Sequence, residues 1–242
     1  MKAIHKTALA AALATVTLTA AAAESPNKFT GNVAYTTDYV FRGISQTQEK
    51  AAIQGGFDYS HSSGLYAGTW ASNVDFLDTA QTEFDWYGGF AGELGKSKLG
   101  YDVGVLSYNY TGGSSDYDFI EVYGKLSYDF GKAALKGGVN YSNDYFNASG
   151  AATYIFADLD MPLGKDFGLS FHVGHQSLDK ADKFWATTGA TDSYVDYKIA
   201  ANYSVGGFGL SLAFIDTDMD KKDCGGTDLC ESRVVFTVSR SM

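Results

Sequence analysis

A period-two pattern of apolar residues runs through the chain after residue 28, in segments of about ten to fourteen residues. In the clearest segment, 118–130, Ile120, Val122 and Leu126 share one face, and Glu121 and Lys125 share the other. Strands of water-soluble proteins are about five or six residues long, whereas a strand tilted across a bilayer needs about nine to eleven. The pattern therefore predicts membrane-spanning β-strands.

The first residues predict export. Lys2 and Lys6 precede an apolar stretch from Ala8 to Ala20, and three alanines then precede Glu24. A positive start, about thirteen apolar residues and a small-residue cleavage site are typical of a secretory signal peptide, and the stretch is too short to span a bilayer. We expect a signal peptide over 1–23 and a single domain over 24–242. Without Lys2 and Lys6 the formal charge changes from −10 to −12, and such an acidic chain is a poor candidate for nucleic-acid binding.

The alternation predicts about twelve strands, within a range of ten to fourteen. We place them at 29–42, 51–60, 65–74, 82–94, 99–110, 117–130, 133–142, 151–161, 167–178, 193–205, 208–215 and 232–241.

The links between these strands alternate between long and short, beginning with a long one. The short links are 61–64, 95–98, 131–132, 162–165 and 206–207, and the long links are 43–50, 75–81, 111–116, 143–150, 179–192 and 216–230. Outer-membrane barrels have short periplasmic turns and long extracellular loops, and closure removes exposed strand edges. The fold class we predict is all-β, a transmembrane antiparallel up-and-down barrel. A soluble β-sandwich is the alternative, but it predicts shorter strands and no such alternation.

Charged side chains fall opposite the apolar faces, so we expect them to line the lumen. A lysine or arginine facing lipid at the bilayer centre costs roughly 2–4 kcal/mol. The basic residues on these faces are Lys125, Lys136, Lys198 and Arg233, and the acidic ones are Asp58, Glu83, Asp85, Glu121 and Asp196. Carboxylates in a pore favour cations. The alternative is that opposed charges neutralise one another and plug a narrow barrel.

Asp38 and Arg42 lie four residues apart near the end of the first expected strand, and therefore on one face. They are candidates for a constriction near the first loop. An equally good interpretation is a structural ion pair that holds Gly43, Ile44 and the adjoining loop.

Catalytic and metal sites find little support. Ser170 and His172 share a face, but residues two apart on a strand are about 7 Å apart, too far for a direct hydrogen bond, so we predict no enzyme. Asp216, Asp218 and Asp220 alternate in the last long loop as weak calcium candidates, but the glycine and glutamate of an EF-hand are out of place. We predict no cofactor and a solvated acidic loop.

Cys224 and Cys230 enclose five residues in the same loop. Two cysteines this close in an exported chain predict a disulfide that closes a small loop, and a thiol or metal role is the alternative.

The stretch 32–47, NVAYTTDYVFRGISQT, resembles the opening of the TorF-type porin family of bacterial outer-membrane proteins. The stretches 54–59, 68–76, 83–85 and 102–105 continue the likeness, which extends over the mature chain but is specific only to about residue 110. The resemblance implies a small outer-membrane β-barrel that passes small solutes. The chain departs from the usual pattern at its end, where Met242 replaces the terminal aromatic residue that helps the barrel-assembly machinery.

The sequence thus predicts a monomeric outer-membrane channel for small polar solutes or ions, in contact with lipid and inserted by the assembly machinery. We expect its narrow lumen to carry more acidic than basic side chains, and to select solutes by size and charge. The main alternative is a plugged structural or adhesive barrel that acts through its extracellular loops. A secreted soluble β-protein is a weaker alternative.

Overall fold

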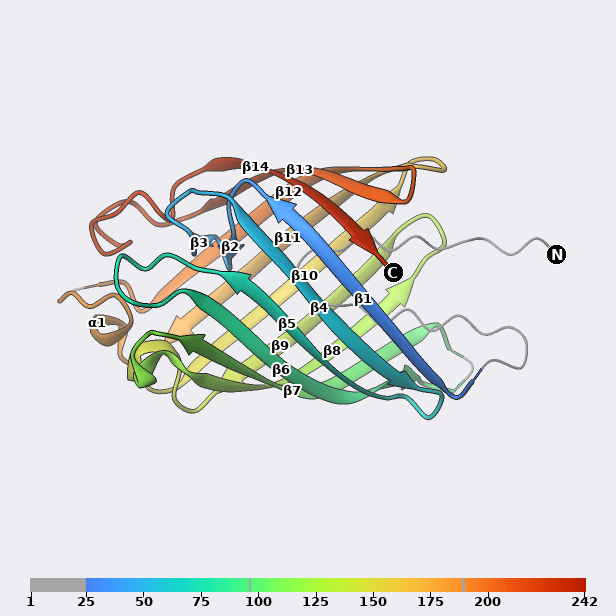
Figure 1. The fold of residues 1–242 in the computed structure, drawn as a ribbon, viewed down its shortest axis with the longest axis horizontal. Helices are drawn as coiled ribbons and strands as arrows, with labels where there is room; N and C mark the ends of the chain where they lie inside the picture. Colours follow the sequence, from blue (N-terminus) through green and yellow to red (C-terminus); the bar gives the residue numbers. More distant parts are fainter. Residues whose placement is uncertain (1–24, 96, 189) are drawn as a thin grey trace.

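The computed structural model describes residues 25–95, 97–188 and 190–242, so the expected signal peptide lies outside the described residues. Twelve strands form one closed antiparallel barrel in which chain neighbours are also sheet neighbours (Figure 1). They are β1 (Asn27–Thr36), β4 (Ala52–His61), β5 (Leu65–Asn73), β6 (Thr82–Glu93), β7 (Leu99–Thr111), β8 (Phe119–Asp129), β9 (Ala134–Ser142), β10 (Ala152–Pro162), β11 (Phe167–Leu178), β12 (Ser193–Val205), β13 (Phe208–Thr217) and β14 (Arg233–Ser241). The predicted fold class is confirmed.

The two ends of the chain close the barrel. β1 pairs with β4 from Asn27↔His61 to Thr36↔Ala52, and with β14 from Asn32↔Ser241 to Thr36↔Thr237. Beyond the last strand, the backbone of Met242 both donates to and accepts from Gly31, at 2.8 and 3.1 Å. Met242 therefore extends the seam by its backbone, although its side chain is not aromatic.

The apolar side chains point outward. On β8, Ile120, Val122 and Leu126 are each at least half exposed, whereas Glu121 between them is 1% exposed. A soluble sandwich would bury this apolar face between its sheets. The alternation in a closed barrel instead gives an apolar outer surface and a polar interior, so the sandwich alternative is wrong.

The connections separate by length onto the two ends of the barrel. Short connections and both ends of the described chain lie at one end, here called the turn end, and the long connections lie at the other, the loop end (Figure 1). Gly206 and Gly207 join β12 to β13 with φ of 59° and 81°, as a two-residue type I′ hairpin turn requires. The loop end carries the short helices η1 (Ser115–Tyr117), η2 (Phe146–Ala148) and α1 (Ala181–Phe184). Of the helices in the described ranges, none has the length and apolar character needed to cross a membrane.

One strand boundary was wrong. The first strand ends at Thr36, not at residue 42, and residues 37–51, here called the inner loop, leave the wall and fold into the barrel. Within the inner loop, β2 (Val40–Phe41) and β3 (Ile44–Ser45) form a minimal hairpin. Tyr39 and Phe41 lie two residues apart as on one face of a strand, but they belong to the inner loop and pack inside the barrel.

Candidate functional site

The inner loop places a tight turn inside the lumen. Arg42 and Gly43 occupy the two turn positions between β2 and β3 with φ of 46° and 80°, the positive values of a type I′ turn. A Cβ at position 43 would lie 2.4 Å from Thr217 Cγ2 and 2.9 Å from Asp196 Cβ. Only glycine fits this approach of the turn to β12 and β13 without displacing the wall.

Arg42 extends from this turn to strands on two other parts of the wall. Its guanidinium donates to both oxygens of Glu121 on β8 at 2.7 and 2.8 Å, and to Gln176 Oε1 on β11 at 2.7 Å. The Cζ atom lies 4.2 Å from the ring centroid of Tyr154. The Arg42 and Glu121 side chains are only 6% and 2% exposed. This is a buried, two-pronged ion pair across the lumen.

Acidic groups outnumber basic ones around this ion pair. Glu121 also accepts from Asn140 Nδ2 at 2.8 Å and from the Tyr108 hydroxyl at 3.2 Å. Glu83 accepts from the Tyr39 hydroxyl at 2.7 Å. Asp85 is buried too, and its Oδ1 has no hydrogen-bond partner among the described residues. The interior therefore leans acidic at this level.

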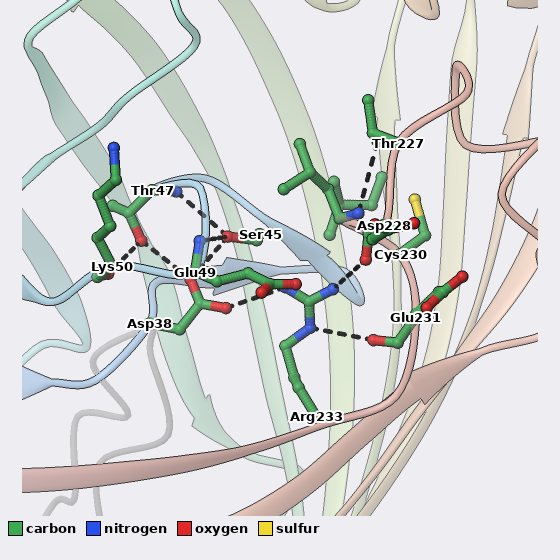
Figure 2. A network of polar contacts seen from close by, with 12 residues as sticks. Asp38, Ser45, Thr47, Glu49, Lys50, Thr227, Asp228, Cys230, Glu231 and Arg233 are labelled. Atoms are coloured by element: carbon green, nitrogen blue, oxygen red, sulfur yellow. Dashed lines mark hydrogen bonds and ion pairs between the residues drawn. The ribbon is translucent and has the colours of Figure 1, made fainter.

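Asp38 anchors the base of the inner loop. Its Oδ1 accepts from Ser45 Oγ at 2.7 Å and Thr47 Oγ1 at 2.9 Å, and its Oδ2 accepts from Arg233 on β14 at 3.0 Å. Arg233 also donates to the carbonyls of Asp228 and Glu231 at 2.9 and 3.0 Å. Figure 2 shows Arg233 between the inner loop and residues 218–232, here called the latch loop.

Cys224 and Cys230 form the predicted disulfide within the latch loop. Both are buried, and the Cys230 carbonyl accepts from Thr217 Oγ1 at 2.8 Å. The neighbouring Leu229 carbonyl accepts from the Ser45 backbone N–H at 2.9 Å. The disulfide thus shapes the segment that contacts the inner loop.

The predicted pairing of Asp38 with Arg42 does not form. Both were expected on one strand, but they lie in the inner loop and each pairs with a residue from the wall: Asp38 with Arg233, and Arg42 with Glu121. The aspartates of the calcium hypothesis also have separate partners, which are the Tyr197 hydroxyl for Asp216, the Val195 N–H for Asp218 and Lys222 for Asp220. Within the described ranges, no group of three or more acidic, histidine or cysteine side chains is arranged to hold a metal ion.

Aromatic side chains fill the rest of the lumen at the loop end. Tyr108 stacks on Phe119 with ring centroids 4.2 Å apart, and Phe119 meets Tyr145 edge to face at 4.5 Å. Tyr39 packs against Trp70 at 5.3 Å. The loop end is therefore closed by packed rings as well as by ion pairs.

The remaining charged candidates extend from Asp196, which lies beside the turn of the inner loop, toward the turn end. Lys136 contacts Asp158 at 2.9 Å, and His172 contacts Asp158 and Asp196 at 2.6 and 3.0 Å. Lys198 is the register partner of His172 on β12. The other pairs here are Lys125–Asp102 at 3.7 Å and Tyr87–Asp58 at 2.5 Å.

Small side chains face inward along one side of the barrel. They alternate with exposed residues such as Ile199, Leu212 and Phe214. The small residues are Asn32 and Ala34 on β1, Ala200 and Asn202 on β12, Ser211 and Ala213 on β13, and Thr237 and Ser239 on β14. This wall thus carries small side chains, and the turn of the inner loop is seated against its β12 and β13 part.

Sequence reasoning missed several members of the site. Gln176 and Tyr154 look like ordinary inward-facing strand residues and Tyr145 like an ordinary loop residue, and no spacing relates them to the inner loop. Asp158 and His172 carried a signal, since both stand opposite apolar faces as the other lumen candidates do.

A family model described as "Bacterial protein of unknown function (Gcw_chp)" matches residues 20–242. No curated protein matches the chain. Among solved structures, the KdgM porin aligns with a TM-score of 0.59 and 5% identity, over 88% of this chain and 97% of that one. The KdgM porin in complex with disordered oligogalacturonate gives the same values over 99% of its chain. The outer membrane channel DcaP of Acinetobacter baumannii aligns with a TM-score of 0.46 and 9% identity, over 89% of this chain and 97% of that one. At these identities the likeness to KdgM shows the barrel fold.

Proposed function

This chain belongs to the Gcw_chp family of bacterial proteins, and we propose that it is an outer-membrane channel for diffusion of small polar solutes or ions. One observation supports this above all: a closed barrel of twelve bilayer-length strands has an apolar outer face and a charged interior. The KdgM porin shares this barrel. The resemblance to the TorF-type porins points the same way, and that finer family assignment is part of the proposal.

The channel would select solutes by their size and charge and would not convert them chemically. Twelve strands leave a lumen narrower than that of sixteen-stranded porins. The turn-end half carries acidic and basic side chains in comparable number, while the loop-end half leans acidic. We therefore expect a mild cation preference. The KdgM structure holds an oligogalacturonate, an acidic sugar, and the acid-leaning lumen of this chain argues against the same cargo.

The direction in which the barrel crosses the membrane is also part of the proposal. A signal peptide over 1–23 would export the chain, and the turn end would face the periplasm with the long loops outside. The barrel would be monomeric, embedded in lipid and inserted by the assembly machinery. No enzymatic activity is part of this proposal.

A second candidate function has one observation in its favour. The inner loop and aromatic rings fill the loop end, as expected for a plugged barrel that acts through its loops.

Conductance in a planar lipid bilayer tests the proposal. We expect discrete current steps from the refolded protein and a reversal potential in a salt gradient that indicates cation preference. Absence of current from a barrel that still shows heat-modifiable migration on a gel would favour the plugged alternative. Anion preference would contradict the acidic lumen.

A further inference from the structure

The inner loop is a separable part of the barrel. Thr36 and Ala52, the residues that flank it, are register partners in the β1–β4 ladder. The loop thus leaves and re-enters the wall at one point, and its first residue, Thr37, continues the β1–β14 seam by hydrogen bonds with Phe236. Its two strands pair only with each other. Movement of residues 38–50 would break the contacts of Gln46, Gln48 and Lys50 with Asp75 but would leave the strand ladders of the wall intact.

Directed polar contacts hold the inner loop in the lumen at both ends. At the tip, Arg42 binds Glu121 and Gln176. At the base, Asp38 binds Arg233, and Ser45 donates to Leu229 in the latch loop. No covalent bond joins the inner loop to the rest of the lumen in the described residues. These contacts define one closed position and can be broken individually.

The latch loop is built to keep its contacts in place. Its disulfide ties position 224 to position 230, on either side of Leu229 and Asp228, whose carbonyls face the inner loop and Arg233. Arg233 Nη1 also lies 3.5 Å from Glu49 Oε1. Figure 2 shows these groups converging on the base of the inner loop. Restricting the latch loop therefore restricts the inner loop.

We propose that the inner loop is a gate that closes the channel at its loop end, and that Arg42, Arg233 and the disulfide-bonded latch loop hold it shut. This inference rests on the proposed channel function and adds its regulation. The gate opens when the inner loop swings out as a unit about Thr36 and Ala52. The space beside β12 and β13, where Gly43 is seated against Asp196 and Thr217, is then free for solute.

Removing the gate provides the main test. Residues 38–50 are replaced by a four-residue Gly-Ser linker, which can join the paired ends of β1 and β4. Heat-modifiable migration checks that the variant is folded. In a planar bilayer we expect at least about a tenfold higher mean current than for the wild-type protein. If the folded variant does not conduct, the channel function itself fails. If the wild type conducts as well as the variant, the channel stands and the gate is refuted.

Weakening the latch tests the mechanism. Arg42→Gln, Arg233→Gln and the double variant Cys224→Ser, Cys230→Ser should each raise the fraction of time spent open several-fold, with unchanged single-channel conductance. Lys222→Gln is the matched control, since Lys222 lies in the latch loop but pairs only with Asp220 and Asp223 among the described residues. An unchanged open fraction in all three latch variants, beside a conducting deletion variant, would refute the latch. A change in single-channel conductance would show that these residues line the open pore instead.

Discussion

The two halves of the lumen hold their charges differently. At the loop end, the side chains of Arg42, Glu121, Arg233 and Asp38 are all less than a tenth exposed. At the turn end, Lys136 and Asp158 are 32% and 20% exposed. The first kind of pair holds a specific position, because a buried charge that loses its partner is costly. The second kind remains hydrated and sets the local charge at low structural cost.

The largest difference in stability should come from breaking one ion pair in each half of the lumen and comparing the two losses. Arg42→Ala leaves Glu121 buried without its cation and should lower the free energy of unfolding by about 3 kcal/mol. Lys136→Ala at the turn end should cost less than about 1 kcal/mol. Urea unfolding in lipid vesicles, followed by tryptophan fluorescence, measures both. Equal losses would abolish the distinction between the two halves.

Two glycines with positive φ allow a second comparison of the lumen with the turn end, since one lies in the inner loop and the other in a short turn. Gly43 and Gly206 have φ of 80° and 59°, but only at Gly43 does a Cβ meet other atoms within 4 Å. Gly206→Ala should cost about 1 kcal/mol for the left-handed backbone. Gly43→Ala should cost about 2–3 kcal/mol, because the contact with Thr217 adds overpacking. The same unfolding assay checks the order, and a reversed order would mean that the turn of the inner loop is not seated against the wall.

Charge removal at the turn end should alter selectivity and leave stability nearly unchanged. Lys198→Gln removes one positive charge from β12, which borders the space proposed for solute. In water, this charge repels a cation about 8 Å away by about 0.5 kcal/mol. Its removal should therefore increase the cation preference roughly twofold. Reversal potentials in a salt gradient measure this at low ionic strength, where screening is weak. Lys165→Gln, in the turn before β11, is the control. No shift at position 198 would place the passage of solute elsewhere.

The smallest effect concerns pH at the rim of the inner loop. The ammonium of Lys50, 2.8 Å away, holds the pKa of the exposed Asp75 carboxyl below its usual value. Because the pKa is lower when folded, this contribution is present above the unfolded pKa and is lost as pH falls through the folded value. Protease cleavage of the inner loop should therefore increase slightly below about pH 4. Asp75→Asn should remove that increase, and a pH response that survives in this variant would have to come from another group.

The sequence predicts one class of feature well and another poorly. Strand periodicity and turn residues are local, so the barrel, its connections and the inward direction of residues such as Glu121 and Lys198 could be predicted. The partners of the inner loop could not. Arg42 and Glu121 are 79 residues apart, and no spacing encodes their contact. The pattern also predicts Asp38 on the first strand, whereas the strand ends at Thr36 because the next residues turn into the lumen as the β2–β3 hairpin.

The contact between Asp38 and Arg233 has a consequence for the order of folding. These residues are 195 positions apart, joining the segment after the first strand to the start of the last one. The Thr37 N–H likewise donates to the Phe236 carbonyl on β14 at 2.9 Å. Neither contact exists until the final hairpin has docked, and closing so long a loop is slow. The base of the inner loop is therefore fastened only when the last strand joins the first, so this contact forms only in a completed barrel.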